Sequence, residues 1–520
     1  MPSPAEKLAQ ALESLERLQK SGRAAIRSKD LTRTEREILL KNGYIQMVMK
    51  GWYIPSRPDE RPGDSTPWYS AFWEFSADYA NDRFGDQWCL SPEQSILLHV
   101  GNRTVPTQLI IRAPKGGNKP VDLIHGTSIF DFRGSIPQAK TIVTQDRLNI
   151  YDLPNALIDA SAIFFSRNPT DARAALAAIS GASALLPRLL DGGHSTIAGR
   201  LCGAFRNIGR DDVADEIKKT MKSVGYEVPE TDPFKEKLQW DNGQRTDSPC
   251  AARLRLMWQT MREEIVSRFP QAPKKTPTPE NYLQQVEEAY VRDAYHSLSI
   301  EGYQVSPKLI EKVRSGKWNP EASEEDRKHH DALAARGYFQ AFESVKKSLA
   351  RVLDGENAGK AANQDHADWY RELFIPLVNA GIQNAASLAG YRNGRVLIKG
   401  SRHIPVSGDA VSELMSVFFE LLELEEDPGA RVVLGHFVFV YIHPFSDGNG
   451  RTARFLMNLM LASGGYPWTV IPVGQRAEYM QALESASVDE DIVPFTHFLG
   501  RIVKGQMDGE DIAKLPQNDN

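Results

Sequence analysis

The chain has 520 residues, of which 41% are hydrophobic and 25% are charged, and its formal net charge is −5. This length exceeds what one hydrophobic core normally holds, so two or three domains are expected, and the charge balance excludes a polycation that coats nucleic acid as a whole. The chain has no long apolar run, and its polar N-terminus lacks the apolar middle of a signal peptide. A cytoplasmic protein without a membrane helix is therefore expected.

The first 66 residues are expected to form a small winged helix-turn-helix module. Residues 1–20 have an exposed helical pattern, residues 21–57 contain short helical pieces followed by a β-hairpin over 43–55, and residues 58–66 are a loop. Residues 20–57 hold nine Lys or Arg residues against three acids. Such a patch on this fold would suit DNA phosphates, and a purely structural or protein-binding winged helix is the alternative.

The remaining chain is expected to contain a companion domain, a linker and a large helical domain. Residues 67–227 mix strands such as 108–112 with Ala- and Leu-rich helices, and residues 228–249 are polar and interrupted by prolines, as in a linker. Residues 250–508 are nearly all helical, and the tail 509–520 is expected to be disordered. The fold class is therefore mainly α. Helices are predicted over 251–268, 280–301, 306–315, 324–354, 366–380, 410–425, 428–442, 449–464, 475–486 and 491–506.

One segment of the helical half interrupts its periodicity. Residues 391–405 have the pattern of two short strands around Lys399, Gly400 and Ser401. A β-hairpin set in an α-helical domain is therefore predicted here.

The run from His443 to Arg454 (HPFSDGNGRTAR) combines groups suited to nucleotide chemistry. Its glycines allow close backbone approach, and the helix predicted to begin near Asn449 presents free N–H groups and the positive end of its dipole to an anion. Arg451 and Arg454 add charge suited to phosphate oxygens, and a carboxylate precedes them at Asp447. His443 is a histidine, and the unperturbed pKa of this residue type suits removal of a proton near neutral pH.

This run resembles the signature of the Fic family, His-x-Phe-x-(Asp/Glu)-Gly-Asn-Gly-Arg-x-x-Arg, at every defined position. The resemblance implies an all-α Fic domain with a β-hairpin flap that transfers AMP from ATP to a Ser, Thr or Tyr hydroxyl of a target protein or of itself. It also implies a catalytic base, a magnesium ligand, an anion-binding loop and a packing residue. These would be His443 as the base, Asp447 for Mg²⁺, Gly448, Asn449, Gly450, Arg451 and Arg454 for the nucleotide, and Phe445 for packing. Gly450 favours AMP transfer, because relatives such as the Doc toxins carry lysine there and phosphorylate.

Two further segments fit the same resemblance. Gly390-Tyr391-Arg392 and the predicted hairpin after it are similar to the Fic flap, on which a target segment would add as a strand. The docking residues would be Val396, Leu397, Ile398, Lys399 and Gly400. Arg476–Glu484 resembles the helix beside the adenine, where Tyr479 would line the base pocket, with a core aromatic as the alternative. No code for the base is readable there, so UTP and GTP stay open beside ATP.

A second motif, Ser297 to Gly302, matches the Fic inhibitory pattern (Ser/Thr)-x-x-x-Glu-(Gly/Asn) and ends the helix predicted within 280–302. By resemblance, Glu301 would pair with Arg454 and occupy the place of the γ-phosphate oxygens, so that the enzyme is inhibited in cis.

The region up to residue 227 loosely resembles AbiEi-type antitoxins and transcriptional regulators. The alternative function is therefore a DNA-binding regulator whose Fic half senses nucleotide or removes AMP. A homo-oligomer is a further possibility.

Overall fold

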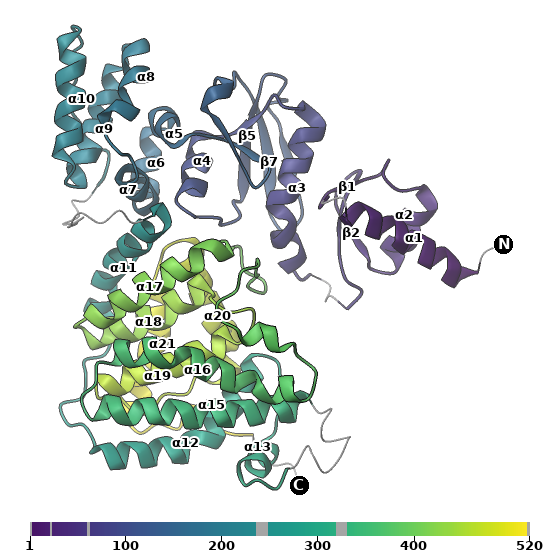
Figure 1. Ribbon diagram of the computed structural model, residues 1–520, viewed down its shortest axis with the longest axis vertical. Coiled ribbons are helices and arrows are strands. Elements are labelled where there is room, and N and C mark those ends of the chain that lie inside the picture. The colour runs from purple at the N-terminus through teal and green to yellow at the C-terminus, as the bar shows by residue number, and fades with distance from the viewer. Residues whose placement is uncertain (1–2, 21–22, 60–62, 236–247, 319–329, 517–520) are drawn as a thin grey trace. The chain divides into compact units, whose positions relative to one another are not determined.

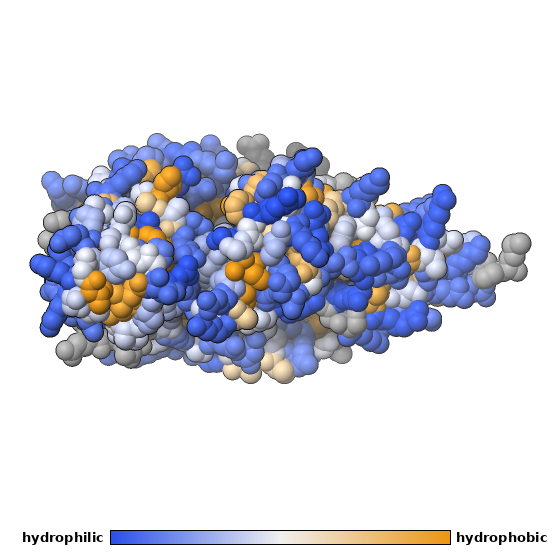
Figure 2. Space-filling view, turned by 90° about the horizontal axis from the view of Figure 1, so that it is seen from above, coloured by the Kyte–Doolittle hydropathy of each residue, from blue (hydrophilic) through white to orange (hydrophobic). Residues whose placement is uncertain are grey.

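The computed structural model describes residues 3–20, 23–59, 63–235, 248–318 and 330–516. The chain is mainly α-helical and divides into two compact units (Figure 1). Unit 1 contains Met1–Leu256 together with Leu397–Ile404, and unit 2 contains Met257–Val396 together with Pro405–Asn520. On the face that Figure 2 presents, hydrophilic side chains predominate and apolar ones form small groups.

The beginning of unit 1 is a small module of two helices and a three-stranded sheet. The predicted hairpin is confirmed, and its two strands, β2 and β3, pair antiparallel, with β1 on the other side of β3. A turn over 28–30 stands between β1 and the second helix, where a helix-turn-helix would have another helix. The elements are α1 (Pro4–Lys20), β1 (Ile26–Arg27), α2 (Arg33–Lys41), β2 (Ile45–Met49) and β3 (Trp52–Pro55).

A four-stranded sheet with the order β4-β5-β7-β6 follows, and its apolar side packs with the aromatic helix α3. Strands β5 and β7 run parallel, whereas the outer strands β4 and β6 are antiparallel to their neighbours. The rings of Trp68, Phe72 and Phe75 meet edge to face in this core. The elements are α3 (Thr66–Phe84), β4 (Cys89–Leu90), α4 (Pro92–His99), β5 (Gln108–Ala113), β6 (Pro120–Asp122), β7 (Ser128–Arg133), β8 (Ile142–Gln145) and β9 (Leu148–Tyr151).

Short helices complete unit 1, and they correct the predicted linker. Residues 228–235 pack against these helices: a Cβ at Gly199 would lie 1.9 Å from the Pro229 carbonyl oxygen, and Phe234 is buried. This part of the chain is therefore packed on the helices through Val228 and Phe234, and residues 236–247 lie outside the described residues. The helices are α5 (Leu153–Asp159), α6 (Ala162–Arg167), α7 (Pro169–Ala177), α8 (Leu186–Asp191), α9 (Ser195–Asn207) and α10 (Asp211–Ser223).

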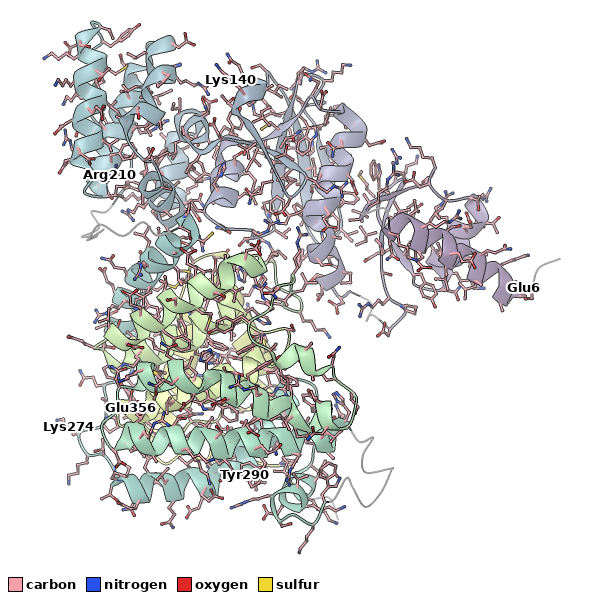
Figure 3. The ribbon with its side chains drawn as sticks, in the orientation of Figure 1. Glu6, Lys140, Arg210, Lys274, Tyr290 and Glu356 are labelled. Carbon is pink, nitrogen blue, oxygen red and sulfur yellow. The ribbon has the colours of Figure 1, made fainter. Side chains whose placement is uncertain are left out.

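Unit 2 is a helical domain built around two helices that are buried on nearly all sides, α18 and α19. Helices that are apolar all round belong at the centre of a bundle. Helices α12, α15 and α16 lie beside one another (Figure 1). Tyr290 lies on α12 (Figure 3). Its ring packs on Phe342 of α15. The helices are α11 (Pro249–Arg268), which begins in unit 1, α12 (Pro279–Ile300), α13 (Pro307–Arg314), α15 (His330–Leu353), α16 (Ala358–Asn379), α17 (Gly408–Leu424), α18 (Pro428–Ile442), α19 (Asn449–Ser463), α20 (Arg476–Val488) and α21 (Val493–Met507).

The hairpin predicted over 391–405 is wrong in its local structure. These residues form a turn at 399–400 but no strands, and the tip 397–404 clusters with unit 1. The physical reason is that the backbone groups of the tip pair elsewhere. Gly400 N–H donates to Thr66 Oγ1 at 2.8 Å, and Val105 N–H donates to the Arg402 carbonyl oxygen at 2.9 Å.

The tail expected to be disordered is ordered over its described part, 509–516. Ala513 is buried, and Arg292 lies 3.6 Å from Asp511, because the tail returns to α12 and α21. Residues 517–520 and the predicted helix start at 324–329 lie outside the described residues. In the part of the chain that is described, no helix is both long and apolar enough to cross a bilayer.

Close packing of α15 on α16 generates a stability prediction. A Cβ at Gly337 would lie 2.0 Å from the Leu373 carbonyl oxygen. Gly337→Ala is therefore expected to cost about 1–3 kcal/mol of overpacking, offset by about 1 kcal/mol of helix propensity. Thermal unfolding should show a lower midpoint. Gly474→Ala, where an added Cβ meets open space, is the control, and equal midpoints for both variants would contradict the packing argument.

Candidate active site

The signature segment lies between the two central helices of unit 2. Helix α18 ends at Ile442, and His443 adopts a left-handed conformation (φ 55°, ψ 61°) while its N–H donates to the Phe439 carbonyl oxygen at 3.0 Å. Pro444 disfavours helix continuation at the preceding residue. A left-handed residue other than glycine costs about 1–2 kcal/mol, so the surrounding contacts must hold this turn.

Phe445 and Asn449 fix the loop from inside. The Phe445 ring stacks on Tyr370 with 3.8 Å between centroids. The Asn449 side chain accepts from Phe445 N–H at 2.9 Å and donates to its carbonyl oxygen at 2.8 Å. The oxygen and one N–H of this amide are thus used within the loop, and the nucleotide-binding role expected for Asn449 stays a prediction.

Gly448 and the start of α19 make the anion-binding part of the loop. Gly448 has φ 77°, and a Cβ there would lie 2.7 Å from the Phe374 ring, so a glycine is needed on both grounds. The first N–H groups of α19, from Asn449 onward, have no partner within the helix. They and the helix dipole present a positive end at this point, which favours a phosphate.

Arg451 is buried with part of its guanidinium unpaired. It is 1% exposed and lies between two rings, with its Cζ 5.2 Å from the Tyr303 centroid and 4.9 Å from the Phe374 centroid. Among the described residues, its Nε and Nη1 have no hydrogen-bond partner. Unsatisfied buried donors are costly, and phosphate oxygens would satisfy them.

Arg454 is held by Ser297 and Glu301 at the end of α12. Its Nε donates to Ser297 Oγ at 2.8 Å, and its Nη2 donates to the Ser297 carbonyl oxygen at 3.0 Å and to Glu301 Oε1 at 2.6 Å. Its Nη1 lacks a partner in the described part of the chain. The motif and the signature, about 150 residues apart in sequence, thus meet at one guanidinium.

The end of α12 places the Glu301 carboxylate against the loop. Gly302 takes a left-handed conformation (φ 96°), and Tyr303 N–H donates back to the Leu298 carbonyl oxygen at 3.2 Å, which closes the helix. A Cβ on Gly450 would lie 2.4 Å from Glu301 Oε1. Burial raises the pKa of Glu301, but Arg454 and Arg451 outweigh burial and hold this pKa below its usual value. The carboxylate is therefore ionised at neutral pH.

His443 is present as a neutral ring with a defined tautomer. Its Nδ1 lies 3.2 Å from the Val440 carbonyl oxygen. Because a carbonyl only accepts, Nδ1 carries the proton and Nε2 keeps its lone pair. Burial lowers the pKa of His443 to about 4. Nε2 is therefore free to accept a proton at neutral pH.

Asp447 is suited to magnesium held jointly with phosphates. Its side chain is 64% exposed beside the loop, and its Oδ1 lies 3.6 Å from Arg451 Nη2. Mg²⁺ commonly uses one or two carboxylates, with phosphate oxygens and water as its other ligands. Over the described ranges, no cluster of three or more His, Cys, Asp or Glu side chains forms a complete metal site. A single carboxylate fits an ion that arrives with its nucleotide.

Tyr479 lies in the core, which favours the alternative given for it above. It is 1% exposed, its O–H donates to His436 Nε2 at 2.7 Å, and its ring stacks on Phe498. Burial raises its pKa to about 12. Its hydroxyl is thus engaged inside the helical domain, and the adenine-lining role stays a prediction.

Sequence reasoning missed several residues that shape the site. Arg392 donates to backbone carbonyls of the loop, and Phe374 and Tyr303 enclose Arg451. Arg392 stood out only as part of the flap resemblance. Phe374 and Tyr303 belong to no motif in the sequence. Their contact with Arg451 becomes visible only when α16 and the end of α12 pack on α19.

The signature segment lies within the part of the chain that matches a known family. Residues 369–461 match the Fic/DOC family, so the chain carries a Fic domain. Protein adenylyltransferase Fic of Drosophila sechellia is 29% identical over 225 residues, 42% of this chain and 42% of that protein, and the same protein of Drosophila mojavensis is 30% identical over 42% and 41%. The chain thus spans less than half the length of these curated relatives. A solved structure, "Fic-1 (aa134 - 508) from C. elegans", is 22% identical, covers 63% of this chain and 91% of its own, and has a TM-score of 0.36.

The amide of Asn449 generates a prediction for the loop. Asn449→Ala leaves the buried N–H and carbonyl of Phe445 unpaired, so the free energy of unfolding is expected to fall by about 1–3 kcal/mol. Denaturant unfolding measures this change. The exposed Asn379 at the end of α16 is the control, and Asn379→Ala should stay within about 0.5 kcal/mol of the wild type. If Asn449→Ala lowers the free energy of unfolding no more than Asn379→Ala does, the amide does not hold the loop.

Proposed function

We propose that this protein transfers AMP from ATP to a hydroxyl group of a protein, and that the contact of Glu301 with Arg454 inhibits the transfer. The observation that carries the proposal is the meeting of three features at one loop. These are a neutral His443 with a free Nε2, a helix N-terminus with partly unpaired Arg451 and Arg454, and a carboxylate of the same chain on Arg454. A base beside a phosphate-binding loop suits nucleotidyl transfer.

The residues of the chain have separate tasks in this reaction. His443 Nε2 accepts the proton of the attacking hydroxyl, whose oxygen forms a bond to the α-phosphorus. The bond from that phosphorus to the oxygen bridging to the β-phosphate breaks, and pyrophosphate leaves. The α19 N-terminus and Arg451 bind and orient the phosphates. Magnesium, held by Asp447 and the phosphates, would neutralise part of their charge.

Inhibition follows from competition for one guanidinium. Arg454 has the geometry to pair with the γ-phosphate, but Glu301 Oε1 already accepts from its Nη2 at 2.6 Å. A carboxylate at that point also repels a triphosphate. ATP would then bind without the alignment that transfer needs. Docking of a target on residues 396–400 stays a prediction from resemblance.

Several basic residues of the N-terminal module form ion pairs within the chain, and DNA binding stays a prediction. Lys20 pairs with Glu16, Arg33 with Glu37, and Arg27 with Asp30 and Asp82. Much of the positive charge is therefore balanced within the chain, and we do not extend the proposal to DNA.

Removal of the Glu301 carboxylate should activate the protein. With α-³²P-ATP, magnesium and a cell lysate, Glu301→Gly is expected to label protein at least about 10-fold faster than the wild type, since Arg454 becomes available to the γ-phosphate. Glu301→Gly/His443→Ala should not label. Glu288→Ala, which removes an exposed carboxylate of the same helix, is the control. Equal labelling by the wild type and Glu301→Gly would remove the inhibitory role.

The protonation state of His443 predicts the pH dependence. Because burial lowers its pKa to about 4, the ring is already a free base at pH 5 and is lost as a base only when the pH falls through about 4. Loss of the nearby Glu301 charge lowers this pKa further. The rate of Glu301→Gly should therefore not decline with an apparent pKa near 6.5. An acid limb centred there would mean that His443 titrates as a solvated histidine.

A further inference from the structure

Arg392 is a buried cation whose side-chain partners, within the described residues, are backbone carbonyl oxygens rather than carboxylates. It is 4% exposed, and its Nε donates to the His443 carbonyl oxygen at 2.7 Å, while its Nη2 donates to that of Ile442 at 3.2 Å. Its own backbone N–H donates to the Pro444 carbonyl oxygen at 2.9 Å. Three consecutive residues at the end of α18 thus receive hydrogen bonds from one side chain and its backbone.

The same side chain closes the base of the segment 393–406. Arg392 Nη1 donates to the Gly394 carbonyl oxygen at 2.9 Å, and Nη2 donates to that of Val406 at 2.8 Å. A Cβ on Gly408 would lie 2.3 Å from the Asn393 carbonyl oxygen, so the two chain segments are in close contact. Arg392 therefore lies where both ends of this segment meet the turn that carries His443.

This arrangement is energetically expensive and geometrically specific. A buried guanidinium without a carboxylate is retained only when several oriented acceptors compensate it. Burial alone lowers the pKa of Arg392, to about 10, so it stays charged at neutral pH. One of its acceptors belongs to His443, a left-handed residue that the loop must hold against strain.

We propose that Arg392 is a positioning residue that holds the His443 turn in the geometry for proton removal and fixes it to both ends of the segment 393–406. This inference rests on the proposed function, in which His443 is the base. In the described part of the chain, the hydrogen bonds of Arg392 go to backbone carbonyls and not to Arg451 or Arg454, which are held on α19 by other contacts. Its loss should therefore affect the chemical step and not the binding of ATP.

The test uses the full chain in the Glu301→Gly background, with Arg392→Met, Arg392→Lys and the exposed neighbour Arg395→Met as control. Arg392→Met is expected to lower the labelling rate at saturating ATP about 100-fold, because a small displacement of a catalytic group has effects of this size. Arg392→Lys, which keeps the charge and some donors, should lose about 10-fold. The Kd of ATP, from calorimetry, should change less than about threefold in all variants.

A second readout does not depend on activity. The His443 ring is followed by NMR in protein with ¹³C-labelled histidine and assigned by its absence in His443→Ala. The charged groups that act on it are Arg392, Glu301 and Asp447, and burial is the main cause of its low pKa. Arg392→Met both opens the turn to water and removes a positive charge, so the His443 pKa should rise from about 4 toward its ordinary value.

The outcomes separate the two claims. A raised His443 pKa with unchanged ATP affinity supports the positioning role, even if Glu301→Gly labels nothing and the proposed function fails. An unchanged His443 pKa in both Arg392→Met and Arg392→Lys would overturn the inference, as would a loss confined to ATP affinity. If Arg392→Met does not fold, the same two measurements on Arg392→Lys decide.

Discussion

The hydrogen bond from Arg454 to Glu301 is the contact on which the arrangement of the site depends. It joins the end of α12 to the first turns of α19, and Ser297 adds two further acceptors for the same guanidinium. Because Glu301 also lies against Gly450, a bulkier residue at position 450 would have to displace the Glu301 carboxylate. Gly450 therefore leaves room for this carboxylate and, in the proposed function, for a phosphate.

The loop itself is held by contacts of only a few side chains. Asn449 closes it from within, Phe445 anchors it on Tyr370, and Arg392 holds the turn at His443 from outside. These contacts offset the cost of a left-handed histidine and leave its Nε2 unprotonated. The unprotonated state of His443 therefore depends on burial and backbone hydrogen bonds more than on neighbouring charges.

Much of the helical domain was predictable because helical periodicity and capping act over short distances. The predicted helix over 428–442 coincides with α18, whereas the start of α16 was placed eight residues late. The signature and the inhibitory motif were found because each is a contiguous pattern. The strands of 391–405 failed because their backbone partners lie about 300 residues away, at Thr66 and Val105. Arg392 was noted only within the flap resemblance, and its contacts with the loop were not predicted because carbonyl acceptors leave no trace in the sequence.

The central claim is that the loop directs attack at the α-phosphorus of ATP. Parallel labelling of Glu301→Gly with α-³²P-ATP and with γ-³²P-ATP, followed by mass spectrometry of the labelled protein, tests this most directly. The account predicts label from the α-phosphate alone, with the mass of AMP added to a hydroxyl-bearing residue. Label from the γ-phosphate alone would establish phosphorylation instead and contradict the assignment of Gly450 to AMP transfer.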